Sequence, residues 1–140
     1  MSQLFVPVGL VLASMACGAS SLPDPDSAPH SANVFIEVPY PPPAALVEIV
    51  PVRPDGGAVW VDGNWVWRGR HYVWQRGGWV HPPEKAAYAS WQAYLAPDGR
   101  LLFAPGTWYD AEHRPIDAPS VLQVARTPPN QTTLETEVAR

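Results

Sequence analysis

The chain has 140 residues, of which 46% are apolar, and this length is enough for one small domain. The formal charge at pH 7 is −4, and residues 1–52 contain no lysine or arginine. Nucleic-acid binding needs a concentrated basic surface and electrostatic attachment to lipid needs a polybasic segment, so the composition argues against both.

Residues 1–16 have the pattern of an export signal, with an apolar stretch over 4–12 followed by small residues up to Ala16. The only cysteine, Cys17, stands where such a signal is cut, and a lone cysteine has no partner for an internal disulfide. Residues 14–18 resemble the lipobox of bacterial lipoproteins, in which the cysteine is lipidated and becomes the mature N-terminus. Two departures are Ser14, where leucine is usual, and the absence of a basic residue before the apolar stretch. The alternative is an ordinary secretory signal with an incidental cysteine.

We therefore expect the protein to be exported and attached to a bacterial membrane by a lipid on Cys17. No stretch is long enough to form a membrane-spanning helix. Gly18, rather than aspartate, follows the cysteine, and the sorting logic of enterobacterial lipoproteins then favours the outer membrane. The expected location is the cell envelope, with the domain facing the periplasm.

The rest of the sequence divides by composition. Residues 17–32 are rich in Ser, Pro, Ala and Asp and predict a flexible tether. Residues 33–126 form the predicted domain. It begins with two strands over 33–38 and 45–50, joined by the stiff prolines 41–43 and followed by a turn at 54–57. Residues 85–90 favour a strand over a helical turn, and 118–126 predict a strand or a short helix. Residues 127–140 predict a disordered tail.

A repeat lies within residues 58–110. The pattern W-x-x-G-x-W occurs twice with every matched position fourteen residues apart, and a looser copy follows with phenylalanine in place of the first tryptophan. Repeats at fixed spacing set the architecture of a protein. The motif residues are Trp60, Gly63 and Trp65, then Trp74, Gly77 and Trp79, then Phe103, Gly106 and Trp108.

The dipeptides 62–63, 69–70 and 76–77 each predict a tight two-residue hairpin turn, because glycine tolerates positive φ. Turn length fixes strand pairing. The predicted pairs are Trp60 with Trp65, Trp65 with Trp74, Trp67 with Tyr72, and Trp74 with Trp79. Since side chains alternate between faces along a strand, Trp60, Trp65, Trp74 and Trp79 would form one row across four strands. Trp67 and Tyr72 would lie in the adjacent row, with valines on the opposite face.

In the third copy, residues 96–99 predict a turn that pairs Leu95 with Leu101 and Ala93 with Phe103, and the dipeptide 105–106 would pair Phe103 with Trp108. Both faces of the resulting sheet are apolar, and at least one of them must be covered. The predicted fold is all-β, an antiparallel meander of short hairpins curled into a small barrel-like roll or a two-layer sandwich.

These residues resemble the YXWGXW (WXXGXW) repeat proteins of bacterial cell envelopes, which are mostly small lipoproteins of unknown function. Tyr72, Trp74, Gly77 and Trp79 match the full Y-x-W-x-x-G-x-W motif. In the first copy Ala58 replaces the tyrosine, and in the third Leu101 and Phe103 replace tyrosine and tryptophan. The resemblance covers about half of the mature protein. It implies export and an all-β repeat module, and it brings no catalytic or cofactor residues.

The tryptophan row has two interpretations. It could be a platform for sugar rings, which stack their C–H faces on indole, or it could be the core of a small domain that lacks disulfides. We favour the core, because aromatic faces of small sheets are usually covered. The glycines Gly63, Gly69, Gly77, Gly99 and Gly106 are interpreted as turn residues.

Catalytic and metal sites find little support. His71 and His81 fall on opposite faces of the predicted hairpin, His30 lies in the tether, and His113 lacks metal-ligand spacing, so we expect no metal and no cofactor. Asp110 and Glu112 are the one conceivable carboxylate pair of the glycosidase kind, although solvated acids explain them better. Among the turn arginines, Arg68 and Arg70 share one end of the hairpin and could contact an acidic glycan.

We therefore expect a non-catalytic, envelope-anchored β module that acts by a structural role or by protein interaction. The first alternative is a glycan- or peptidoglycan-binding module that uses the tryptophan face. The second is an envelope hydrolase with a carboxylate site at Asp110 and Glu112.

Overall fold

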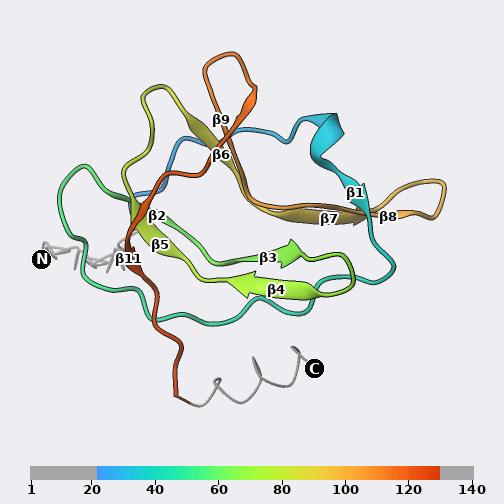
Figure 1. Cartoon of the computed structure of the whole chain (residues 1–140), viewed down its shortest axis with the longest axis horizontal. Helices are drawn as coiled ribbons and strands as arrows, with labels where there is room; N and C mark the ends of the chain where they lie inside the picture. The colour runs from blue at the N-terminus through green and yellow to red at the C-terminus, as the bar shows by residue number, and fades with distance from the viewer. Residues whose placement is uncertain (1–21, 130–140) are drawn as a thin grey trace, which may run out of the picture.

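The computed structural model describes residues 22–129, and within them the fold is all-β (Figure 1). A single 3₁₀ turn, η1 (Ala32–Val34), is the only helical segment among these residues, and no helix within them is long and apolar enough to cross a membrane. The strands are β1 (Ile36–Glu37), β2 (Val59–Val61), β3 (Asn64–Trp67), β4 (Tyr72–Gln75), β5 (Gly78–Val80), β6 (Ala87–Ala89), β7 (Gln92–Leu95), β8 (Leu101–Ala104), β9 (Thr107–Tyr109), β10 (Pro115–Ile116) and β11 (Val121–Val124).

Strands β2 to β5 form one long hairpin, which we call the first hairpin. Its outer half pairs β3 with β4, so that Trp65 lies opposite Trp74. Its inner half pairs β2 with β5, so that Trp60 lies opposite Trp79. The two tryptophan pairs are five positions apart on both arms, so one register runs through the whole hairpin. Pairing is interrupted only at 62–63 and 76–77, where both arms bend out of one sheet and into the next.

Strands β6 to β9 repeat this construction as a second hairpin. Strand β7 pairs with β8, with Ala93 opposite Phe103, and β6 pairs with β9, with Tyr88 opposite Trp108. Again the two pairs are five positions apart on both arms. The bends fall at 90–91 and 105–106. The repeated sequence therefore encodes a bent arm of a long hairpin, not a short hairpin of its own.

The two true turns match the prediction, and the other three do not. The turn at 69–70 pairs Trp67 with Tyr72, and the turn at 96–99 pairs Leu95 with Leu101. The tight turns predicted at 62–63, 76–77 and 105–106 are wrong, and so are the pairs that depended on them, namely Trp60 with Trp65, Trp74 with Trp79, and Phe103 with Trp108. Positive φ is found at Gly69 and Gly99, whereas the glycines of the bends lack the left-handed backbone that a tight hairpin turn requires.

Short additional strands widen three of the sheets. Strand β1 pairs with β8, β10 with β9, and β11 with β5, which gives three-stranded sheets beside the two-stranded β3–β4 pair. The strand expected at 85–90 is confirmed by β6, and of the two alternatives for 118–126 the structure has the strand, β11. The strand predicted over 45–50 is reduced to a single bridge between Ile49 and Arg126, because prolines border this run on both sides. The residues described form small antiparallel sheets and no closed barrel.

The segment before the domain is partly bound to it. The sequence predicts a flexible tether over 17–32, but the carbonyl of Pro23 accepts a hydrogen bond from Trp60 N at 2.7 Å. Further along, Tyr88 N donates to the carbonyl of Asp26 at 2.7 Å, and Ala28 N donates to the carbonyl of Tyr88 at 3.0 Å. Backbone groups of an exposed strand edge need partners, and residues 23–28 supply them for both β2 and β6. This segment therefore ties the two hairpins together.

The core consists of three clusters. Trp65 and Tyr72 of the first hairpin pack against Phe103 of the second, with Val38 completing the cluster. Trp60 and Trp79 pack with Ala58 and Ala125. Val80, Ala86 and Trp108 form the third cluster, which joins β5 to the second hairpin. The predicted row of four tryptophans is thus divided between two clusters, because the bends direct the two pairs into different sheets.

Candidate functional site

The bend of the first hairpin surrounds a carboxylate that comes from outside the repeat. Glu48 Oε1 accepts hydrogen bonds from Trp74 Nε1 at 2.9 Å and from Gly77 N at 3.2 Å. Glu48 Oε2 accepts from Gly77 N at 3.0 Å and from Gly63 N at 3.2 Å. Both motif glycines and one motif tryptophan therefore bind the same carboxylate. We call this arrangement the carboxylate corner.

Glycine is required at positions 63 and 77 because a side chain would have no room there, and not because φ is positive. A Cβ on Gly77 would lie 2.7 Å from both Gly63 N and Val61 O, and 2.8 Å from Glu48 Oε2. A Cβ on Gly63 would contact the Trp74 ring and would lie 2.6 Å from Glu48 Oε2. Any larger residue at either position would collide with the opposite arm or with the bound carboxylate. The interpretation of Gly69 and Gly99 as turn residues is correct, whereas that of Gly63 and Gly77 is wrong.

Glu48 belongs to residues 44–52, an extended segment that we call the strap. Leu46 packs against the cluster of Trp65 and Tyr72, and Val50 packs against the cluster of Trp60 and Trp79. The alternate residues face outward, with Val47 62% exposed. This period of two, predicted for a strand, directs Glu48 inward between two apolar contacts. Glu48 belongs to no sequence motif, and its one signal is a carboxylate at an inward position of an apolar run.

The paired tryptophans of the motif are mostly buried. Trp60, Trp65 and Trp79 are 2%, 3% and 2% exposed. Ring centroids are 5.4 Å apart for Trp60 with Trp79 and 5.0 Å apart for Trp65 with Trp74, both with edge-to-face geometry. Trp60 Nε1 donates to Asp62 Oδ1 at 2.8 Å, and Trp79 Nε1 donates to the carbonyl of Pro51 at 2.9 Å. These ring faces pack on protein, so a sugar ring cannot stack on them.

One area of solvent-exposed aromatic surface lies at the tip of the first hairpin. Tyr40 is 42% exposed, and its ring lies 5.3 Å from Trp67 and 5.8 Å from Tyr72. Its hydroxyl donates to the carbonyl of Arg70 at 2.6 Å, and Tyr72 Oη donates to the carbonyl of Tyr40 at 3.1 Å. Burial, followed by the influence of Tyr40, raises the pKa of the Tyr72 hydroxyl above its usual range. The tip thus combines a rigid aromatic group with the exposed turn residues Arg68 and Arg70.

The third motif copy is built for packing alone. Phe103 is 0% and Trp108 is 4% exposed. A Cβ on Gly106 would collide with the hydroxyl of Tyr88, so this glycine also marks a close approach rather than a tight turn. Burial, with a further contribution from the charge of Asp62, raises the pKa of Tyr88 to about 12.

A small cleft of about 70 Å³ opens between β3, β5 and the second hairpin. Its polar residues include Asp62, Asn64 and Arg76, and Trp108 and Val121 line it as well. Asn64 is 7% exposed, and its Oδ1 is buried without a hydrogen-bond partner. The cleft is small and lined partly by polar groups, including this unpaired oxygen. It suits ordered water rather than a substrate.

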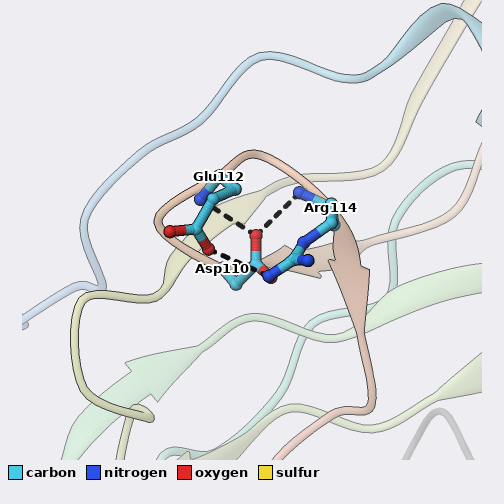
Figure 2. A network of polar contacts seen from close by, with 3 residues as sticks. All are labelled: Asp110, Glu112 and Arg114. Carbon is cyan, nitrogen blue, oxygen red and sulfur yellow. Dashed lines mark hydrogen bonds and ion pairs between the residues drawn. The ribbon is translucent and has the colours of Figure 1, made fainter.

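Figure 2 shows that Asp110 and Glu112 contact the same arginine. Arg114 Nη2 lies 2.7 Å from Asp110 Oδ2 and 3.0 Å from Glu112 Oε2. Asp110 Oδ1 also accepts from the backbone N–H groups of Arg114 at 2.9 Å and Glu112 at 3.0 Å. These hydrogen bonds, with the Arg114 backbone N–H first, hold the pKa of Asp110 below its usual range. A glycosidase needs one carboxyl that keeps its proton, and here the carboxylates instead close the turn between β9 and β10.

The histidines are dispersed. His81 Nε2 lies 3.1 Å from Asp55 Oδ2 at the surface. The pKa of Asp55 is lowered, mainly by the backbone N–H of Gly57 and also by His81. The ring of His113 stacks on Tyr109, and His30 Nε2 hydrogen-bonds the carbonyl of Ser90. Across residues 22–129, no group of three or more His, Cys, Asp or Glu side chains is placed to hold a metal ion.

Large apolar residues are exposed on both the strap and β11. The Ile49–Arg126 bridge places the two segments side by side. The large apolar residues exposed there are Val47, Ile49 and Val52 of the strap and Val121, Leu122 and Val124 of β11. Among the sheets of residues 22–129, β11 is an edge strand that pairs with β5. Exposed apolar groups beside a sheet edge are typical of a protein-binding surface.

The fold and these surfaces define the class of the molecule as a small all-β module of two bent hairpins. Comparisons of the sequence and the structure with protein-family models, with characterised proteins and with solved structures found no match. Cys17, the predicted lipidation site, lies outside the described residues.

Proposed function

We propose that this protein is a non-catalytic, envelope-anchored β module that acts by binding another envelope protein. The observation that carries the proposal is the division of its apolar side chains. The motif residues Trp60, Trp65 and Trp79 are used in the core, while Leu122 and its neighbours are exposed on β11, an edge strand among the described residues. In this proposal the two hairpins form a two-layer roll that presents this surface.

The anchoring part of the proposal rests on the sequence around Cys17 and on the resemblance to the YXWGXW repeat proteins. Residues 17–21 connect the predicted lipid to the bound segment that begins near Pro23. Such a short connection would hold the module close to the membrane. Replacing Cys17 with alanine should release the protein from sedimented membranes, and continued sedimentation would contradict lipid anchoring.

Binding is tested with two variants matched in exposure and in strand context. Leu122 on β11 is 43% exposed and Val73 on β4 is 42% exposed. Purified Cys17→Ala protein would be immobilised and incubated with detergent-solubilised envelope proteins, in parallel with the same protein carrying Leu122→Asp or Val73→Asp. We expect Leu122→Asp to abolish saturable binding and Val73→Asp to preserve it. Equal binding by all three proteins would contradict this assignment of the surface.

A second candidate function is glycan binding at the tip of the first hairpin. It is favoured by the exposed Tyr40 ring against Trp67, beside Arg68 and Arg70, an arrangement suited to an acidic sugar polymer. Trp67→Ala should then remove binding to isolated peptidoglycan, while Leu122→Asp should leave it intact. We do not extend the proposal to hydrolysis, because Asp110 and Glu112 are both paired with Arg114. An Asp110→Asn, Glu112→Gln double variant that lost a measured turnover would reopen that alternative.

A further inference from the structure

In the carboxylate corner, the hydrogen-bond donors and the carboxylate that accepts from them come from different elements. The three N–H donors all belong to the first hairpin, with Gly63 and Gly77 at its bends and Trp74 on β4. The acceptor, Glu48, comes from the strap, which precedes the hairpin in the sequence. Strand pairing on either side of the bends, with Trp65 opposite Trp74 and Val61 opposite Gly78, brings the donors together on one element. The three donors of one element therefore converge on a carboxylate supplied by another.

The charge of Glu48 is met by neutral donors. Within residues 22–129, no lysine, arginine or histidine forms an ion pair with it. Each carboxylate oxygen accepts two hydrogen bonds, and Gly77 N is shared between the two oxygens. Backbone N–H groups that converge in this way form an anion-binding concavity. Shared donation by Gly77 N to both oxygens suits a planar anion with two oxygens on one carbon.

The backbone of the bends leaves no room for a side chain beside the carboxylate. The Cβ positions of residues larger than glycine at 63 and 77 would lie 2.6 and 2.8 Å from Glu48 Oε2. The backbone of both bends is thus in close contact with the carboxylate.

We propose that the bend of the first hairpin is a carboxylate-binding site that Glu48 fills from within the same molecule, and that it accepts a carboxylate from another molecule when Glu48 is absent. The ligand class is a carboxylate on a flexible stem, as in the side chain of an acidic residue or the C-terminus of a peptide. This inference does not depend on the envelope partner proposed above. The strap then acts as an internal ligand of the repeat motif.

The test removes the internal ligand and supplies a small one. Full-length Glu48→Ala protein would be titrated with acetate, and the amide resonances of Gly63 and Gly77 and the indole resonance of Trp74 would be followed by NMR. We expect these resonances to shift saturably and the thermal midpoint to rise with acetate. Acetamide, the neutral analogue, and chloride at matched ionic strength should do neither. Wild-type protein should not respond, because Glu48 occupies the site.

Glu84→Ala is the matched control, since Glu84 is an exposed carboxylate, and it should behave as wild type. The proposal is overturned if Glu48→Ala folds and its three resonances do not shift when acetate is added. It is also overturned if chloride shifts these resonances as much as acetate does. If Glu48→Ala does not fold in chloride, refolding is repeated in acetate. Recovery of the native spectrum in acetate alone supports the site, and failure to fold in both salts overturns it.

Discussion

Glu48 and Gly77 lie 29 residues apart, and the Gly77 amide donates to both oxygens of the Glu48 carboxylate at 3.0 and 3.2 Å. This contact joins the strap to the bend of the first hairpin. The glycine of the W-x-x-G-x-W motif thus leaves room for a carboxylate, because it has no side chain, and binds that carboxylate through its N–H group. Neither role is visible in the motif itself, because the bound residue lies outside the repeat.

Replacing Glu48 with glutamine should destabilise the fold substantially. The amide keeps one acceptor oxygen but directs its own N–H₂ group at donors, which leaves at least one N–H of the corner unpaired. Hydrogen bonds to charged groups contribute about 1.5–3 kcal/mol each, and a loss of about 3 kcal/mol in the free energy of unfolding is expected. Urea denaturation measures it. Glu84→Gln, at an exposed site, should change the midpoint little, and equal effects of the two substitutions would contradict the role of Glu48.

Gly77→Ala tests the steric part of the account. The added methyl would meet Gly63 N and Val61 O at 2.7 Å, and backbone atoms do not move aside as the ends of flexible side chains do. Overpacking typically costs about 1–3 kcal/mol, and we expect the upper end of that range or more. Gly56→Ala is the control, since nothing lies within 4 Å of its Cβ position and its φ is not positive. A Gly77→Ala protein as stable as the control would show that the bend is not close-packed.

Trp79→Ala should be among the most damaging substitutions. Trp79 is 2% exposed, packs edge-to-face on Trp60, and donates its indole N–H to Pro51. Truncation of a buried tryptophan costs about 3–5 kcal/mol, a large share of the stability of a domain this size. Val52→Ala, in the same strap region but 87% exposed, should be nearly neutral. Differential scanning calorimetry of both variants distinguishes a core tryptophan from a ligand platform, whose removal would leave the thermal midpoint unchanged.

Much of the fold is predictable from local sequence, and the errors have one cause. The turns at 69–70 and 96–99 were predictable because positive φ has a strong preference for glycine, and the structure places Gly69 and Gly99 at φ of 72° and 88°. At Gly63 and Gly77, by contrast, glycine is required by the close approach of distant segments. Local sequence does not distinguish these two uses of glycine, because the second depends on a tertiary contact.

The candidate site was less predictable for the same reason. Burial of Trp60 and Trp79 agrees with the favoured interpretation of the tryptophans as core, but their division between two clusters depends on the bends. Glu48 gave no motif signal, since its partners lie 15, 26 and 29 residues further along the sequence. The binding of residues 23–28 to strand edges was also hidden, because their composition is typical of a linker while their role depends on backbone groups alone.

The raised pKa of Tyr88 predicts that the fold loses stability at high pH. Burial raises its pKa from the usual 10.0 to about 12, so the folded state keeps the phenol protonated where the unfolded state ionises. This contribution is fully present below pH 10.0 and is lost as the pH rises towards 12. It amounts to about 2–3 kcal/mol at 1.36 kcal/mol per pKa unit. Chemical denaturation at several alkaline pH values should show this decline in wild type and a weaker decline in Tyr88→Phe, and identical pH dependence would contradict it.

The most direct test of the account is the solvent access of the motif tryptophans in the Cys17→Ala protein. Tryptophan emission would be recorded with acrylamide quenching, in the presence and absence of peptidoglycan fragments. Because Trp60, Trp65, Trp79 and Trp108 are buried, the account predicts blue-shifted emission with a large unquenched fraction that glycan leaves unchanged. Red-shifted, readily quenched emission that glycan protects would contradict it, and would make the tryptophan motif a binding site rather than the core of the fold.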